Sequence, residues 1–147
     1  METDETDTET ELTGNQTGTE SVGNRSEATV AGGLEENVAG ALTYLFGFVT
    51  GFIFYLIEDD NEFVRFHAAQ SIIVFGGLLV LSFAITFMQI FLEMMPAIGW
   101  IMSLTLGIFS TLLGPIAFIL WIVLLVKAYK GQRYGLPIAG DMAEGWV

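Results

Sequence analysis

The chain has 147 residues, of which 52% are hydrophobic and 15% are charged, and its formal net charge is −12. A water-soluble globular domain carries about 25% charged residues, so this composition argues against an ordinary soluble domain. Five basic residues against 17 acidic ones exclude a basic surface for nucleic acid, and the lack of cysteine excludes disulfides and cysteine-ligated metals. The remaining class is a small, all-α integral membrane protein surrounded by the lipid bilayer.

The chain begins with a polar, acidic segment. Ten of the 17 acidic residues lie within residues 1–36, against one base, Arg25. Because so few apolar residues cannot offset the chain entropy lost on folding, we predict a disordered tail over residues 1–33. This tail lacks the basic start and apolar core of a signal peptide. Asn15 and Asn24 match the glycosylation pattern, and an acidic chain with two lysines suits a high-salt organism such as a halophilic archaeon.

Apolar stretches between residues 34 and 140 define the predicted transmembrane domain, which a short C-terminal tail over 141–147 follows. The first stretch, 38–57, carries no charge. Twenty residues of helix reach about 30 Å, the thickness of the hydrocarbon core of a bilayer. The second stretch, 68–92, is also uncharged. Each of these two stretches is predicted to be one transmembrane span.

The third apolar stretch, 97–126, is too long for one upright span, since 30 helical residues extend about 45 Å. We predict one span over 104–126, preceded by an interfacial or re-entrant piece over 95–103 that Trp100 anchors. The alternative is a pair of shorter spans that break at Gly114 and Pro115. The predicted architecture is therefore a bundle of three spans, with four as the alternative.

The basic residues favour the three-span arrangement. With three spans, the first loop and the C-terminus share one side of the membrane, together with all the bases that follow the tail: Arg65, Lys127, Lys130 and Arg133. Because loops rich in Lys and Arg remain in the cytoplasm, we predict a cytoplasmic C-terminus and an acidic tail outside the cell. Four spans would separate Arg65 from the C-terminal bases and place the tail in the cytoplasm.

Small residues recur every four positions in two rows. The first row is Ala39, Thr43, Gly47 and Gly51, and the second row is Gly99, Ser103, Gly107 and Thr111. Small side chains let two helix backbones approach closely, so both rows are predicted to pack against helices of the same chain. Self-association through the GxxxG pattern of Gly47 and Gly51 is the alternative.

A polar stripe follows one side of the second predicted span. Within an arc of about 100° lie His67, Ser71, Ser82, Thr86, Gln89 and Glu93. Polar groups on a lipid-embedded helix should face protein or water. We favour hydrogen bonds between helices, because residues 74–81 are apolar and interrupt the stripe. A hydrophilic pathway is the alternative.

Residues for catalysis or metal binding are not grouped in any known pattern. His67 is the one histidine, and zinc needs several His or Cys ligands. Ser71 lies one turn from His67, but no acid is placed to orient the ring. We therefore predict no enzyme activity, no cofactor and no metal. His67 and Gln70, three residues apart, are expected to tie the first loop to the C-terminal segment.

Two segments that flank the predicted spans carry a family resemblance. They are Phe63-Val64-Arg65-Phe66-His67-Ala68-Ala69-Gln70 and the set Ala128, Gly131, Tyr134 and Pro137 at intervals of three. Together they resemble the Tic-twenty-like family, which comprises small prokaryotic membrane proteins of unknown function related to a subunit of the chloroplast inner-envelope import translocon. The resemblance covers residues 34–140. It implies a helical membrane protein without catalytic residues, and the four spans of the chloroplast relatives raise the four-span alternative.

The sequence favours a non-enzymatic role. Two rows of small residues and an acidic tail suggest a scaffold or accessory subunit that contacts other membrane proteins or a second copy of itself. The resemblance links this role to protein translocation or membrane assembly. The polar stripe supports the alternative, a small channel or transporter for ions or small solutes.

Overall fold

The computed structural model describes residues 30, 33–96 and 98–147. The predicted tail, with Asn15 and Asn24, lies almost entirely outside the described residues. The described part is all-helical, as predicted. Its elements are α1 (Glu36–Leu42), α2 (Phe48–Ile57), α3 (Glu62–Ser71), the π-helical turn η1 (Ile72–Gly76), α4 (Gly77–Glu93), α5 (Gly99–Tyr129) and α6 (Ala139–Glu144).

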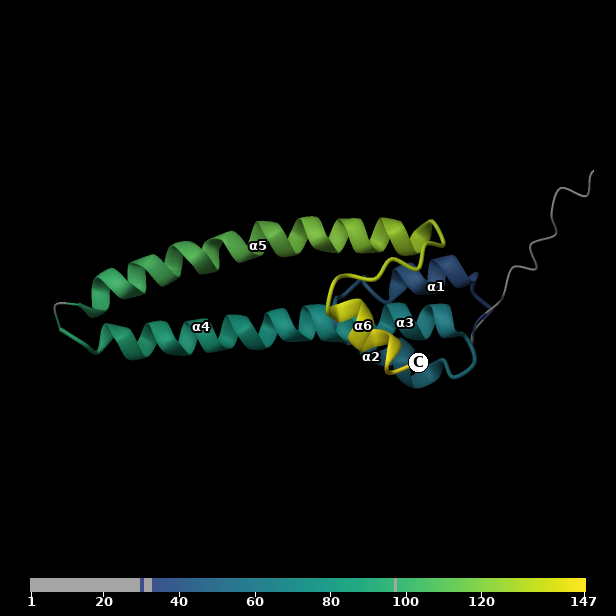
Figure 1. Ribbon diagram of the computed structural model, residues 1–147, viewed down its shortest axis with the longest axis horizontal. Helices are drawn as coiled ribbons and strands as arrows, with labels where there is room; N and C mark the ends of the chain where they lie inside the picture. Colours follow the sequence, from purple (N-terminus) through teal and green to yellow (C-terminus); the bar gives the residue numbers. More distant parts are fainter. Residues whose placement is uncertain (1–29, 31–32, 97) are drawn as a thin grey trace, which may run out of the picture.

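Two long helices form an antiparallel hairpin that sets the length of the molecule (Figure 1). One is the continuous helix Glu62–Glu93, made of α3, η1 and α4, and the other is α5. At 1.5 Å per residue, their 32 and 31 residues each extend about 45 Å. Both are apolar and long enough to cross a membrane, and outside α3 few of their residues are buried. Three spans were predicted, and the described part of the chain has two helices of this length.

The third apolar stretch is one uninterrupted helix, which contains the predicted span over 104–126 and begins earlier than predicted. α5 begins at Gly99 and continues through Pro115 to Tyr129. Residues 95–103 therefore form no separate interfacial piece, and the break proposed at Gly114 and Pro115 is wrong. A proline removes one backbone hydrogen bond, and membrane helices tolerate this loss when the remaining bonds hold the helix.

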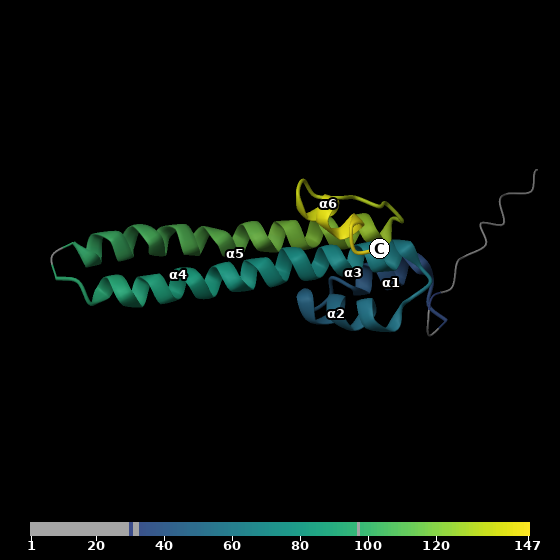
Figure 2. The same ribbon diagram turned by 60° about the horizontal axis from the view of Figure 1, so that its bottom comes forward.

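The first apolar stretch, by contrast, is not one continuous helix. α1 ends at Leu42, residues 43–47 turn, and α2 returns along α3 and η1 (Figure 2). We call α1, this turn and α2 the short hairpin, and residues 43–47 its tip. Gly47 has a φ of 60°, a left-handed conformation that breaks the helix at little cost only for glycine. The ten residues of α2 extend about 15 Å, too short to cross a bilayer.

A glycine-capped turn ends α5 and directs the chain back over α3. The Gly131 N–H donates to the Ala128 carbonyl at 2.9 Å, and the Gln132 N–H donates to the Lys127 carbonyl at 3.0 Å. This pair of bonds is the Schellman motif, in which glycine takes a positive φ, here 69°. A Cβ on Gly131 would lie 2.8 Å from Asn37 Oδ1 of α1. This turn reverses the chain after α5, so that residues 132–138 lead back and α6 packs on α3.

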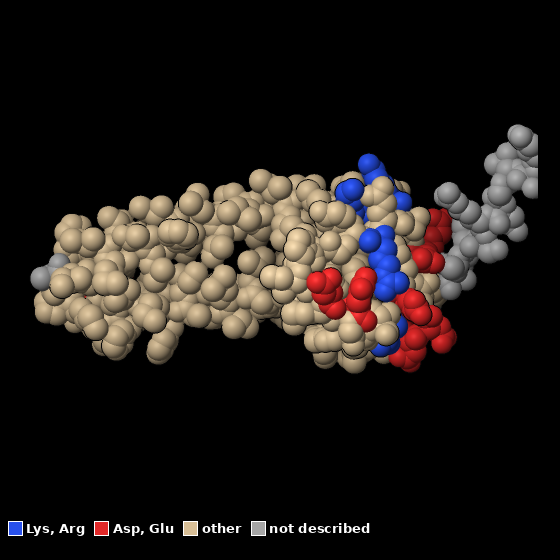
Figure 3. Space-filling view, in the orientation of Figure 1, with Lys and Arg blue, Asp and Glu red and all other residues tan. Residues whose placement is uncertain are grey.

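The short hairpin, α3, α6 and the end of α5 pack together at one end of the long hairpin, which we call the capped end. Buried side chains from separate elements meet there, including Tyr44, Phe66 and Leu124. Except for Glu93, every charged residue of the described chain lies on the elements or loops of this end. Figure 3 shows Lys and Arg as a band beside the apolar remainder of the long hairpin, which we call the shaft. Acidic groups lie beyond this band and on α6. This basic band comprises Arg65, Lys127, Lys130 and Arg133.

Candidate functional site

The tip of the short hairpin is a non-helical turn among apolar surfaces, and side chains of three other elements satisfy its carbonyl groups. Ser71 Oγ lies 2.9 Å from the carbonyl oxygens of both Thr43 and Gly47. Trp121 Nε1 of α5 donates to the Tyr44 carbonyl at 2.6 Å. In a bilayer, a broken helix is stable only where protein groups replace the missing backbone bonds. The bonds from α3 and α5 therefore fix the short hairpin in place.

Thr50 of α2 also forms hydrogen bonds with the backbone of the tip. Its Oγ1 donates to the Thr43 carbonyl at 3.0 Å and accepts a hydrogen bond from the Phe46 N–H at 3.1 Å. One hydroxyl thus serves as donor and acceptor across the turn, as hydroxyl groups can.

A buried network of three side chains lies between the tip and the C-terminal segment. The Gln70 amide donates through Nε2 to Tyr44 Oη at 3.2 Å and to the Tyr134 carbonyl at 3.1 Å. Gln70 Oε1 accepts from the Leu136 N–H at 3.2 Å. Since Gln70 supplies a proton to Tyr44 Oη, the phenol proton points to His67 Nδ1, 3.0 Å away. We assign the imidazole proton to Nε2 for this reason.

His67 is enclosed by aromatic rings and makes few polar contacts. The rings of Tyr44, Phe63 and Phe66 lie edge-on to it, with centroid separations of 5.7, 4.5 and 5.3 Å. Within the described residues its Nε2 forms no hydrogen bond of good geometry, and the Gln132 backbone is a polar group that interacts with the ring. This environment positions His67 as a packed core residue, with Gln70 making the predicted connection to the C-terminal segment.

Other residues of the two segments that carried the family resemblance, 63–70 and 128–137, also meet at the capped end. Phe66 is buried with Ala143, and Ala128 is buried against Tyr44. Arg133 lies 4.7 Å above the Phe66 ring. Gly131 forms the turn after α5, and the Pro137 carbonyl accepts from the Ala139 N–H at 2.9 Å, where α6 begins.

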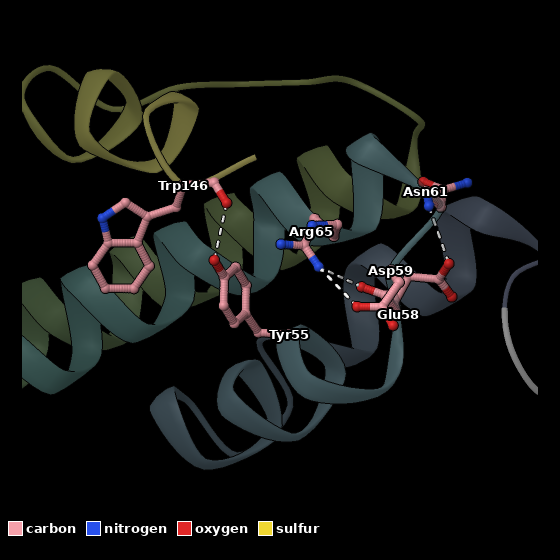
Figure 4. A network of polar contacts seen from close by, with 6 residues as sticks. All are labelled: Tyr55, Glu58, Asp59, Asn61, Arg65 and Trp146. Atoms are coloured by element: carbon pink, nitrogen blue, oxygen red, sulfur yellow. Dashed lines mark hydrogen bonds and ion pairs between the residues drawn. The ribbon is translucent and has the colours of Figure 1, made fainter.

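Polar contacts also fix the first loop and join α2 to the C-terminus, as Figure 4 shows. Arg65 Nη1 donates to the Glu58 carbonyl at 2.9 Å and lies 3.4 Å from Asp59 Oδ1. Asn61 Nδ2 donates to Glu36 Oε2 at 3.2 Å. The hydroxyl of Tyr55 in α2 donates to the Trp146 carbonyl at 2.9 Å. These contacts join the first loop to the start of α1, and α2 to the C-terminus.

The first row of small residues does not lie along one helix, contrary to the prediction. Gly51 is on α2, where an added Cβ would lie 2.9 Å from the Ala68 carbonyl oxygen, so α2 and α3 touch through their backbones. Gly47 is at the tip, where a Cβ would lie 3.3 Å from Phe75 Cβ. Both glycines therefore pack within the chain, and the GxxxG pattern presents no continuous helical face to a partner.

The second row lies on α5 and faces α4. A Cβ on Gly107 would lie 3.4 Å from Gln89 Nε2, and Ser103 Oγ lies 3.3 Å from Glu93 Oε1. An open groove of about 830 Å³ runs along this contact, which we call the polar groove. Its lining comprises Gln89, Glu93, Trp100, Ser103, Leu104, Gly107, Ile108, Thr111 and Leu112.

The polar stripe is divided between different environments. Ser71 holds the tip, and Ser82 and Thr86 donate to carbonyls one turn earlier in their own helix at 2.8 and 2.9 Å. Gln89 and Glu93 line the polar groove. The structure thus gathers Gln89, Ser103 and Gly107 in one place, and it separates them from Ser71.

Sequence reasoning missed the donors and acceptors of the tip, above all Trp121, Thr50 and Tyr44. Trp121 carried a usable signal, because a tryptophan far from either end of an apolar stretch needs a partner for its N–H. For metal binding, no three His, Cys, Asp or Glu side chains of the described segments are close enough to hold an ion together.

Comparison with known proteins identifies the family of the chain. Residues 28–143 match the MamF/MmsF family, described as the magnetosome magnetite crystal formation protein family. A UPF0132 membrane protein of Methanocaldococcus jannaschii is 49% identical over 112 residues, covering 76% of this chain and 88% of its own. One from Archaeoglobus fulgidus is 42% identical over 111 residues, covering 76% and 94%. No solved structure matches.

These matches overturn the resemblance to the Tic-twenty-like family. That resemblance depended on a few residues beside the spans, many of which have packing roles at the capped end. The family match extends over most of the chain, and the archaeal relatives carry the description of membrane protein. The chain is a membrane protein that belongs to the MamF/MmsF family and is similar to the UPF0132 membrane proteins of archaea.

Proposed function

We propose that the chain is a non-enzymatic membrane scaffold or accessory subunit that packs against another membrane protein through its polar groove. The observation that carries this proposal is that the side-chain amide of Gln89 has no hydrogen-bond partner within the described chain. The Gln89 side chain lies in the groove. Polar side chains at membrane depth face protein or water, because exposure to acyl chains is costly. A neighbouring protein helix would supply the missing partner.

Protein translocation and solute transport have less support than a scaffold role. The link to protein translocation depended on the resemblance that the family match overturns. A channel or transporter would need polar groups along the whole shaft, whereas Ser82 and Thr86 bond to their own helix. The family description names magnetite crystal formation. Our proposal concerns only the contact with a partner protein.

A photocrosslinker in place of Leu104 should capture a protein partner in native membranes, because Leu104 lines the polar groove and is 59% exposed. The matched control is Ile116, also on α5 and 60% exposed but outside the groove. We expect a defined protein adduct from position 104, identified by mass spectrometry, at several times the yield from position 116. Only lipid adducts at both positions would contradict the proposal.

We also propose a topology of two spans with the capped end in the cytoplasm. The basic band lies at this end, and loops rich in Lys and Arg remain cytoplasmic. From Trp100 to Lys127, α5 extends about 40 Å, which matches a hydrocarbon core with its interfacial regions. The short hairpin would then be re-entrant, with its tip near Phe75 and about 15 Å below Arg65. The chain before α1 would enter from the cytoplasm.

Single cysteines introduced at Glu35, Asp60, Gln132 and Pro96 test this topology, since the chain has no cysteine of its own. Impermeant maleimide should label position 96 in intact cells, and it should reach the other three positions only after the membrane is opened. Label on Glu35 opposite to Asp60 and Gln132 would support three spans. Label on Asp60 opposite to Gln132 would support four.

A further inference from the structure

We propose that the cytoplasmic end of α5 holds an anionic phospholipid, with its phosphate on Lys127 and Lys130 and an acyl chain on the apolar face below them. A groove of about 270 Å³ lies at this place. Its lining comprises Ile122, Val123, Val126, Lys127, Lys130 and Gln132. The groove is therefore apolar towards the shaft and cationic towards the capped end, as a lipid with a charged headgroup requires.

Helix geometry places these lining residues on one side of α5. Ile122, Val126 and Lys130 are spaced by four, as are Val123 and Lys127, so the apolar side chains lead directly to the two amines. Gln132 follows the glycine turn and adds an amide at the polar end. A headgroup phosphate at this position would meet two ammonium groups and one amide donor.

The two lysines differ from the two arginines of the basic band in having no acidic partner within the described chain. Arg65 lies 3.4 Å from Asp59, and Arg133 lies 3.7 Å from Glu62. Lys127 Nζ instead lies 5.1 Å from the centre of the Tyr134 ring, and Lys130 is exposed. The positive charge of the lysines is therefore available to an anion, whereas carboxylates partly neutralise the arginines.

The position of the lysines along α5 selects a lipid over a soluble anion. Lys127 lies about 40 Å from Trp100, which places the amines in the headgroup layer of the proposed topology. Basic pockets beside membrane helices bind anionic headgroups, and each Lys or Arg near such a surface strengthens binding about fivefold. The apolar lower part of the groove adds contacts with an acyl chain that free phosphate cannot make.

Titration of phosphatidylglycerol into the purified full-length protein in a nonionic detergent tests the site, with native mass spectrometry counting bound lipid. We expect phosphatidylglycerol to bind at least tenfold more tightly than phosphatidylcholine. Lys127→Gln and Lys130→Gln should each weaken it about fivefold. Arg133→Gln, the matched control, removes the same charge from the same band and should change binding less than twofold.

Three results would overturn the proposal. The first is unchanged phosphatidylglycerol binding by either folded lysine variant, with a retained melting temperature as the check of folding. The second is an equal loss for Arg133→Gln, which would indicate attraction by the whole band. The third is displacement of the lipid by inorganic phosphate at equal concentration, which would make the site one for a soluble anion. Because both lysine side chains lie outside the buried network, either variant alone can decide the result.

Discussion

Gln70→Leu should destabilise the protein by about 3 kcal/mol or more. The substitution keeps the size of the side chain but removes the amide that joins three parts of the capped end. It would leave the Tyr134 carbonyl and the Leu136 N–H without their partner, and Tyr44 Oη without its donor. A buried polar group that loses its partner costs about 1–3 kcal/mol, so three such losses are severe.

Chemical unfolding in mixed micelles measures this effect as the free energy of unfolding, with helix content as the signal. Gln132→Leu is the matched control, because it makes the same change at an exposed side chain after the glycine turn. Its effect should remain within about 0.5 kcal/mol, as for most surface substitutions. Equal stabilities of the two variants would show that Gln70 does not hold the C-terminal segment.

The second apolar stretch shows how far sequence patterns predict this fold. An uncharged run of helical length gave the core of the helix Glu62–Glu93, because in lipid every backbone group of a long helix bonds within the helix itself. The start of this helix is capped by the residue before it. Asn61 Oδ1 accepts from the Val64 N–H at 3.0 Å, as a capping residue does.

The first apolar stretch shows what these patterns omit. Hydropathy describes residues 38–57 as one span, but the chain turns at Gly47. The groups that make the turn stable are Ser71 and Trp121, which follow the tip by more than 20 and more than 70 residues. No local pattern contains this information, because each donor is placed by a different helix. The prediction of three spans counted residues 38–57 as one helix, whereas two helices of the described residues are long enough to cross a bilayer.

The sequence identified several of the polar residues that belong to the candidate site, but it did not identify their hydrogen-bond partners. Gln70 and Tyr134 were both singled out, and the hydrogen bond between them was visible only after α5, its glycine turn and α3 were placed together. Ser71 and Gln89 belong to one predicted polar stripe, yet one holds the tip and the other lines the polar groove. The position of a polar residue on a helix therefore limits its possible partners, and the packing of the other helices determines which partner it has.

Gly51→Ala should separate α2 from α3 and lower stability by about 2–4 kcal/mol. The new Cβ would lie 2.9 Å from both the Ala68 carbonyl oxygen and Ser71 Cβ. The first of these atoms belongs to helix backbone and cannot move alone, so the helices must shift apart. Overpacking of this kind costs about 1–3 kcal/mol, and a shift of Ser71 would also weaken its bonds to the Thr43 and Gly47 carbonyls.

Gly77→Ala provides the matched control for this prediction. Gly77 is also helical, and a Cβ there would meet nothing within 4 Å, so alanine should stabilise the helix by up to about 1 kcal/mol. Unfolding in mixed micelles should give opposite signs for the two variants. If Gly51→Ala were as stable as Gly77→Ala, α2 would not pack closely on α3. The short hairpin would then lose its main support, because the tip carbonyls depend on that contact for Ser71.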